Sequence, residues 1–344
     1  MKNRAVPIFP MHQVAALTAV ATFLLLIAGA LVTSTDSGLA VPDWPLSYGT
    51  WFPPIVGGIR FEHGHRMLAG AVGLMILILA VWLGRYQPKR WVRRLGWMAL
   101  GGVMVQALLG GLTVLWLLPP PVSIAHACLG QTVFVLVACI ARGTSPRWVI
   151  EPPRLPVEHG AGLTRLGLAA ACLAAGQLLL GAVIRHTGYA VFVHITGAVG
   201  LAAVAGALGF RAVRVRRAAP MVWTAVLRLL VLVGVQLGLG AFVFLHRGSV
   251  IFRTSHVALG ALVLAQAVLL AWEMIRRAPS RNARSGWREK WGRFYFPSIS
   301  SSGENRTVPI FGSCSGRPGA WRDYLELTKP RLSLLVLLTT AVGY

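Results

Sequence analysis

The stretch Gln106-Ala-Leu-Leu-Gly110, with His126 twenty residues after its glutamine, returns as Gln236-Leu-Gly-Leu-Gly240, with His256 at the same spacing. Each glutamine stretch lies in one long apolar segment, and its histidine lies in the next one. Self-similarity of this kind indicates that one structural unit is used more than once in the chain. The pattern therefore predicts an internal duplication of paired apolar helices.

The composition predicts a polytopic membrane protein. Of the 344 residues, 56% are hydrophobic and only 12% are charged, and the mean hydropathy is +0.66. A helix needs about twenty apolar residues to cross a bilayer. With that length, the chain contains eight candidate spans, at residues 12–33, 65–84, 95–117, 123–141, 162–184, 191–210, 221–245 and 252–275.

A weaker echo completes the repeat, because His65 and the later Gly70-Ala-Val-Gly73 match His194 and Gly197-Ala-Val-Gly200. The expected fold is all-α, with eight transmembrane helices as two repeated four-helix bundles. Parallel repeats of this kind usually stand side by side about an axis along the membrane normal. We expect the N-terminal half to cover residues 1–141 and the C-terminal half residues 142–278.

The net charge of +23 comes mainly from the connections between apolar segments. Arginines and lysines fill every second connection, around residues 85–94, 142–165 and 211–217. By the positive-inside rule these connections face the cytoplasm. We expect a multi-pass protein of the cell inner (plasma) membrane with a cytoplasmic N-terminus, in contact with lipid and not with nucleic acid. The four cysteines show no metal-binding or disulfide spacing.

Four histidines, one in each of four spans, are the best clue to function: His65, His126, His194 and His256. An ionisable side chain at membrane depth is by default a functional candidate. Imidazole is a common axial ligand of haem iron, and bundle cores hold such cofactors between facing side chains. All four lie toward the outer ends of their spans. The competing interpretation is that each histidine only caps a helix or bonds a neighbour at the interface.

The first half carries a carboxylate that the second half lacks. Glu62 lies three residues before His65 and shares its face if the helix begins by residue 62, whereas the matching position in the second half is Val191. A carboxylate beside a haem could accept a proton, which suggests that the reaction belongs to the first half. Alternatively, Glu62 is a loop-end carboxylate paired with Arg60 or Arg66.

The outer connection 34–62 is rich in glycine, proline and short polar residues and predicts an ordered lid. Arg66, Arg185 and Arg253 lie near the outer ends of histidine-bearing spans. They could pair with haem propionates, or they could extend to the lipid headgroups.

Several motifs together resemble haem A synthase, the cytochrome oxidase assembly factor, over residues 12–275. They are the run from Gly29 through Val-Pro-Asp-Trp-Pro to Leu46, Glu62-His-Gly-His-Arg66, Gln106-Ala-Leu-Leu-Gly-Gly-Leu-Thr113 and Arg185-His-Thr-Gly188. The resemblance implies an enzyme that oxidises the C8 methyl of haem O to the formyl group of haem A, with haem b as cofactor. By position, Glu62 would be the reaction-site carboxylate. His65 and His126 would bind the substrate haem iron, and His194 and His256 the haem b iron.

Two features depart from that family. Many members carry paired cysteines in the first outer loop, whereas residues 34–62 contain none. The connection from His186 to His194 is also shorter than the second lid expected from the family.

The chain changes character after residue 278. Residues 279–320 are basic and then rich in serine and glycine, and predict a cytoplasmic linker. Residues 321–344, with Trp321-Arg-Asp-Tyr-Leu-Glu-Leu-Thr-Lys-Pro-Arg331 and a truncated ninth apolar segment, resemble the start of protohaem IX farnesyltransferase, the haem O synthase. This part alone holds no acidic motif for magnesium diphosphate and would be inactive in prenyl transfer.

Three classes of function follow: a haem A synthase, a non-catalytic di-haem b membrane cytochrome, and a haem-handling assembly partner without activity. The expected partners are haem O synthase, fused or separate, and the components that assemble cytochrome oxidase.

Overall fold

The computed structural model describes residues 8–149, 152 and 154–278, and this part of the chain is built of helices. Eight long helices have the length and apolar character to cross a membrane, which confirms the expected all-α, eight-span fold. Their bounds are α1 Ile8–Ser34, α2 Ile59–Tyr86, α3 Arg90–Leu115, α4 Pro120–Thr144, α6 Val157–Thr187, α7 Val191–Ala212, α8 Pro220–Leu245 and α9 Val250–Arg277. Two short elements, α5 Pro146–Val149 and the 3-10 turn η1 Val213–Val215, lie in connections.

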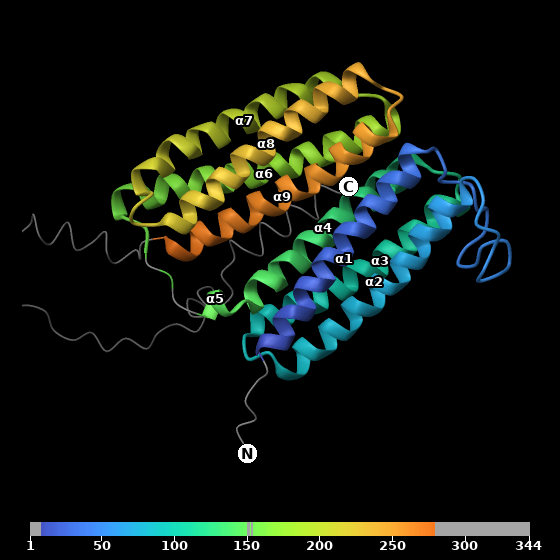
Figure 1. Cartoon of the computed structure of the whole chain (residues 1–344), viewed down its shortest axis with the longest axis horizontal. Helices are drawn as coiled ribbons and strands as arrows, with labels where there is room; N and C mark the ends of the chain where they lie inside the picture. The colour runs from blue at the N-terminus through green and yellow to red at the C-terminus, as the bar shows by residue number, and fades with distance from the viewer. Residues whose placement is uncertain (1–7, 150–151, 153, 279–344) are drawn as a thin grey trace, which may run out of the picture.

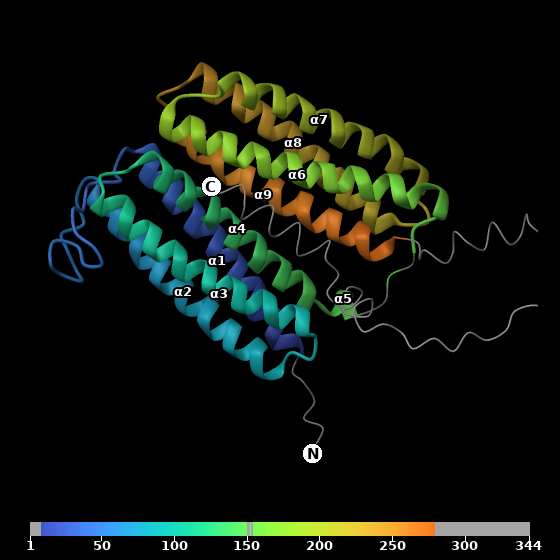
Figure 2. The same ribbon diagram turned by 180° about the vertical axis from the view of Figure 1, so that it is seen from behind.

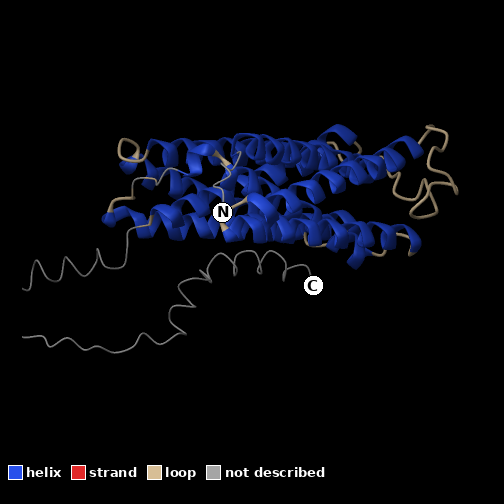
Figure 3. Ribbon diagram, turned by 90° about the horizontal axis from the view of Figure 1, so that it is seen from below, coloured by secondary structure: helices blue, strands red, loops and turns tan. Residues whose placement is uncertain are grey.

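The long helices form two four-helix bundles side by side, α1–α4 and α6–α9 (Figures 1 and 2). Within each bundle, consecutive helices pack as neighbours and the last helix closes against the first. The connections inside the bundles are short except for the one from α1 to α2. The bundles meet where α1 and α4 contact α9 and α4 contacts α6. All eight helix axes run along one common direction (Figure 3).

The buried share of each helix depends on its position in the two bundles. In α4 and α9 more than half of the most apolar window is buried, because both helices lie at the junction of the bundles. In α7 and α8 the buried share is 17%, and large apolar side chains such as Phe192 and Val231 face outward. An apolar outward surface suits a hydrocarbon environment, because the backbone N–H and C=O groups of a helix already bond to one another and need no water.

Two ends of the molecule can be distinguished. The loop end carries residues 35–58, which connect α1 to α2 and extend away from the first bundle (Figure 1). The opposite end carries α5, whose Trp148 packs against Trp91 and Trp272, with ring centroids 6.2 and 4.5 Å apart. We call these three residues the tryptophan cluster. They come from α3, α5 and α9, so the cluster joins the two bundles at this end.

Charged side chains reinforce the tryptophan cluster. The guanidinium of Arg276 lies 4.1 Å from the centre of the Trp148 ring, a distance suited to a cation–π interaction. Buried Glu273 accepts from Arg142 at 3.3 Å and from Arg277 at 2.7 Å. Because Arg142 belongs to α4 and Glu273 to α9, this ion pair also crosses between the bundles.

Most of the helices begin earlier than expected, and two of these starts bear on the histidines. The second span begins at Ile59 rather than residue 65, and the fourth at Pro120 rather than residue 123. Proline in the first turn suits a helix start because its missing N–H is not needed there. His65 and His126 therefore lie at least a full turn inside their helices, deeper than the sequence alone suggested.

Candidate haem site

The four histidines all lie near the loop end, on α2, α4, α7 and α9, two in each bundle. In the second bundle the ring centroids of His194 and His256 are 6.3 Å apart. A metal–imidazole bond is about 2 Å and the bonded nitrogen lies about 1 Å from the ring centre, so two imidazoles on one metal are about 6 Å apart. In the first bundle His65 and His126 are close enough to interact electrostatically.

Each histidine ring lies against a glycine on the helix that precedes its own in the chain. A methyl group at these glycines would come within 3.0 Å of the His65 Cε1, 3.1 Å of His126, 3.5 Å of His194 and 3.3 Å of His256. The glycines are Gly29 on α1, Gly110 on α3, Gly181 on α6 and Gly240 on α8. Glycine lets the imidazole lie directly on the neighbouring backbone, inside the bundle rather than in lipid.

The two nitrogens of these rings have different surroundings. The Nδ1 atoms of His65, His126 and His256 are buried without a hydrogen bond. The rings interact electrostatically with the backbone of Leu25, Gln106 and Gln236, respectively. The Nε2 atoms of His65 and His126 have no hydrogen bond and are not among the buried unpartnered atoms, so they are accessible, whereas Nε2 of His256 lies 3.4 Å from the Gln236 amide. Histidines that bind a metal keep the other ring nitrogen against a carbonyl in this way, so the pairs fit an axially ligated haem.

Three glutamines hold the histidine-bearing helices at the same height. The Gln106 Nε2 donates to the backbone carbonyl of His126 at 2.8 Å, and that of Gln236 to His256 at 3.1 Å. The Gln236 Nε2 also lies 3.4 Å from Nε2 of His256. Gln177, in the amide orientation that satisfies both of its ends, donates to the His194 carbonyl at 2.9 Å.

The sequence reasoning missed Gln177. The sequence does contain a signal for this residue, because Gln177 precedes Gly181 by four residues, just as Gln106 precedes Gly110. The spacing from Gln177 to His194 is seventeen residues rather than twenty, mainly because His194 lies three residues after the start of α7, whereas His126 and His256 lie six residues after the starts of α4 and α9. Only three residues connect α6 to α7, so the expected short connection after His186 is present in the structure.

Glu62 lies on α2, which begins at Ile59, so it shares a helix face with His65 as the sequence required. The carboxylate is buried and both oxygens have partners. One oxygen accepts from the backbone N–H of Val41 at 2.9 Å, and the other pairs with Arg66 at 2.7 Å. Arg60, the other expected partner, instead lies over the ring of Phe61.

Residues 35–58 form an ordered lid that is attached to α2. Arg66 donates to the backbone carbonyls of Asp43, Leu46 and Val41. His63 is buried, with its Nδ1 2.9 Å from the Ser47 hydroxyl. Glu62, His63 and Arg66 therefore hold the lid together from one turn of α2.

The lid also has internal hydrogen bonds. The N–H groups of Gly49 and Tyr48 donate to the Asp43 carboxylate at 2.8 and 2.7 Å. These bonds, that of Gly49 first, lower the pKa of Asp43 below its ordinary value of 3.8. The Trp44 ring packs on α3, where a side chain at Gly111 would collide with it. The lid thus covers the loop end of the first bundle in a defined conformation.

Arg185 and Arg253 of the second bundle both contact the end of α1. Arg185 donates to the carbonyl of Thr33 and lies 3.6 Å from the Asp36 carboxylate, and Arg253 donates to the carbonyl of Ser34 at 2.8 Å. The last carbonyls of a helix carry partial negative charge, which favours guanidinium groups there. The second bundle is therefore joined to the point where the lid begins.

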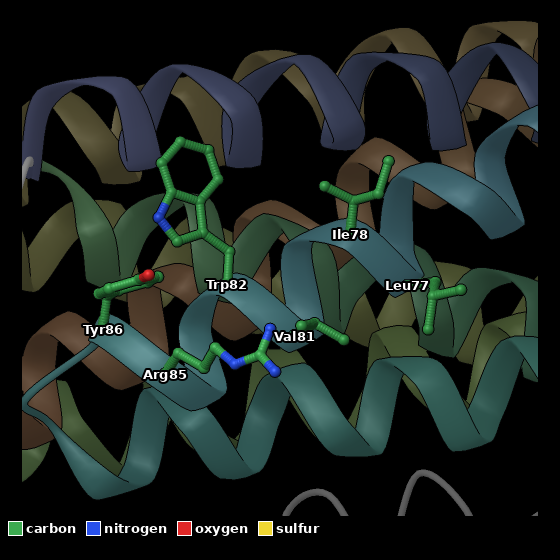
Figure 4. A pocket seen from close by; sticks show the side chains of 6 residues that line it. All are labelled: Leu77, Ile78, Val81, Trp82, Arg85 and Tyr86. Atoms are coloured by element: carbon green, nitrogen blue, oxygen red, sulfur yellow. The ribbon is translucent and has the colours of Figure 1, made fainter.

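Two other features do not form the site. A shallow groove on α2, lined by Leu77, Ile78, Val81, Trp82, Arg85 and Tyr86, lies toward the other end of that helix from His65 (Figure 4). Within the described residues no three histidine, cysteine or acidic side chains gather around one point. Each histidine pair thus suits haem iron, whose remaining ligands belong to the bound porphyrin.

The fold and the histidine pairs define a multi-pass helical membrane protein with two bundles, each of which presents two imidazoles near the same end. A family model described as "Cytochrome oxidase assembly protein" matches residues 59–192, which include Glu62, His65 and His126. Relatives named "Heme A synthase" are similar to the chain. That of Lysinibacillus sphaericus is 41% identical over 100 residues, 28% of this chain and 33% of the relative.

Longer matches are weaker in identity. The "Heme A synthase" of Symbiobacterium thermophilum is 32% identical over 174 residues, 48% of this chain and 56% of the relative. That of Halalkalibacterium halodurans is 29% identical over 175 residues, 50% of this chain and 58% of the relative. The chain therefore spans between a third and somewhat over half of the length of these relatives.

Proposed function

We propose that this protein is a haem A synthase, which oxidises the C8 methyl of haem O to the formyl group of haem A. The observation that carries the proposal is the set of four histidines, each inside one bundle against a glycine, at one height. We chose this reaction because the chain is similar to proteins named "Heme A synthase". With water as the source of oxygen, converting the methyl to a formyl group releases four electrons and four protons, so the reaction requires an external electron acceptor that takes the electrons from haem b.

The proposal gives the bundles different tasks. His65 and His126 hold the substrate haem O in the first bundle, and His194 and His256 hold haem b in the second. Bound haem b supplies an iron that accepts and passes on single electrons. Glu62 lies on the same helix face as His65, where a carboxylate can take up a proton. The lid restricts water at this end of the bundle.

The three arginines are proposed as propionate partners. Arg66, Arg185 and Arg253 lie at the loop end and donate to backbone carbonyls there. A guanidinium has five N–H groups, so Arg185 and Arg253 have N–H groups left for a propionate beside their backbone carbonyl. Arg66 already donates from its two Nη atoms to three carbonyls and to Glu62, and only its Nε–H is left for a propionate.

One observation favours a second candidate, the non-catalytic di-haem b cytochrome. Both carboxylate oxygens of Glu62 are already used, by Val41 and Arg66, to attach the lid. A structural Glu62 would leave two electron-transfer haems and no site of reaction.

Analysis of extracted haems separates the two functions. Cells that make haem O and this protein should accumulate haem A or a hydroxylated haem O, whereas the cytochrome would hold two b-type haems and no modified product. Glu62→Ala should abolish product and retain haem. The matched control is Ser47→Ala, which removes a lid contact to His63 without touching Glu62. Equal loss of product in both variants would mean that Glu62 only attaches the lid and takes no part in the reaction.

Ligation in the second bundle has its own test. His256→Ala should remove the low-spin haem signal of that bundle from the absorption and electron paramagnetic resonance spectra. An unchanged spectrum would contradict the pairing of His194 with His256.

The remaining expectations belong to the same proposal. From the positive-inside rule we propose that the loop end, and hence the haem sites, faces the outer side of the cell inner membrane, and that haem O synthase and oxidase assembly components are the partners. The linker 279–320 and the farnesyltransferase-like residues 321–344 lie outside the described residues, and the fusion stays a prediction.

A further inference from the structure

We infer that His65 is the histidine that releases the iron when the substrate haem is exchanged, because it alone of the four lacks a glutamine clamp on its backbone. By glutamine clamp we mean the hydrogen bond from Gln106, Gln177 or Gln236 to the backbone carbonyl of the facing histidine. The inference rests on the proposed function and assigns exchange to one ligand of the first bundle.

Each clamp needs a glycine as well as a glutamine. Gly130 follows His126 by four residues, and a methyl group there would lie 3.0 Å from Nε2 of Gln106. Gly260 stands in the same place after His256, with 3.2 Å to Gln236, and a methyl group at Gly197 would collide with Gln177. Because the glycine has no side chain, the glutamine amide can reach the backbone carbonyl of the histidine, which lies about one turn earlier on the same helix as the glycine.

The first helix pair lacks both partners. Leu25 stands four residues before Gly29, where the other pairs have glutamine, and Ala69 stands four residues after His65, where His126 and His256 are followed by glycine. Leucine has no hydrogen-bond donor, and Ala69 carries a methyl group at the position where Gly130 and Gly260 leave space for the amide. Among the described residues, no side chain donates to the carbonyl of His65.

His65, His126 and His256 are otherwise alike, which isolates the difference. All four rings lie on a glycine, and those of His65, His126 and His256 have a buried, unpartnered Nδ1. A clamp fixes the backbone from which the ring extends, and one hydrogen bond of this kind changes an equilibrium by about fivefold. His65 therefore turns away from iron more easily than the other three.

This asymmetry agrees with the different needs of the bundles. A substrate haem has to enter and a product haem has to leave, so one ligand must open while another keeps hold. The first bundle has one clamped histidine, His126, and one without a clamp, His65. The second bundle has clamps on both His194 and His256, as suits a resident cofactor.

The test measures haem release rather than activity. The full chain in detergent is loaded with iron protoporphyrin IX and mixed with excess apomyoglobin, and the transfer is followed by absorbance. The wild type should release haem in a fast and a slow phase. His126→Ala, which removes a first-bundle ligand, identifies the phase that belongs to that bundle.

Building the missing clamp should slow the fast phase. Leu25→Gln together with Ala69→Gly should reduce its rate about fivefold, the effect of one hydrogen bond. Leu25→Met with Ala69→Gly is the matched control, of similar size and without a donor, and should release haem as the wild type does or faster. Conversely, Gln236→Leu should speed the slow phase by a similar factor.

The outcomes separate the inference from the proposed function. Two bound haems with a fast phase that the Leu25→Gln/Ala69→Gly variant leaves unchanged would overturn the role of His65 and leave the haem sites intact. The same holds if Gln236→Leu does not speed the slow phase. A wild-type chain that binds no haem would overturn both the inference and the proposed function.

Discussion

Adding one methyl group at each of the four glycines that face the histidines should disturb the sites in a set order. The variants are Gly29→Ala, Gly110→Ala, Gly240→Ala and Gly181→Ala. The new carbon would lie 3.0, 3.1, 3.3 and 3.5 Å, respectively, from the nearest ring carbon. Carbon atoms in good contact are about 3.5–4.0 Å apart. The ring of His65 therefore has to move by about 0.5 Å, whereas that of His194 need not move.

Two opposing energies set the size of the effect. An overpacked methyl group costs about 1–3 kcal/mol, and alanine is about 1 kcal/mol more favourable than glycine inside a helix. Gly29→Ala should thus destabilise the folded protein by about 0–2 kcal/mol, whereas Gly181→Ala should stabilise it by up to about 1 kcal/mol. Displacement of a ligand by half an ångström should weaken haem binding in the first bundle about tenfold, or about 1.4 kcal/mol.

The assay is a titration of each purified variant with iron protoporphyrin IX, followed by absorbance, together with thermal unfolding in detergent. Gly64→Ala is a matched control on α2, because a methyl group there has open space around it. Equal loss of affinity in all four variants, or the largest loss in Gly181→Ala, would refute the contact between ring and backbone as the cause.

Two further predictions concern the ends of the molecule. Glu273→Gln should lower the free energy of unfolding by about 3–5 kcal/mol, because Arg142 and buried Arg277 lose their shared carboxylate; a melting temperature as little changed as in exposed Glu158→Gln would contradict this. The lid should loosen as the pH falls through the lowered pKa of Asp43. A carboxyl whose pKa is lowered by folding stabilises the folded protein fully above its ordinary pKa, here 3.8, and this stabilisation is lost when the carboxyl is protonated. Limited proteolysis with an acid-stable protease from about pH 5 down to about pH 2, the range over which a carboxyl with a lowered pKa becomes protonated, should show this change in the wild type and not in Asp43→Asn.

The fold could be predicted from the sequence because span length and apolar character leave few alternatives in a membrane. The ends of the spans could not be placed as well. Polar residues such as Glu62 and His63 continue α2 beyond its apolar part, and they are buried only because the lid covers them. The proline at residue 120 marked the start of α4, a signal that an apolar window does not register.

The candidate site was only partly accessible from the sequence. The four histidines stood out as titratable residues in apolar spans, and the structure brings them together in pairs. The contacts of Arg185 and Arg253 with Thr33 and Ser34 depend on how the bundles pack, which no local pattern encodes. The use of Glu62 by Val41 likewise depends on the lid, whose chain has no periodicity to follow.

The two bundles are joined at both ends, by the tryptophan cluster at one and by Arg185 and Arg253 at the other. A structure fastened at both ends cannot open like a hinge at either one. Under the proposed function, the gap that an electron crosses between the two irons is then the same in every turnover. Tunnelling rates depend steeply on that gap, so a constant separation gives the same transfer rate for each haem that the first bundle binds in turn.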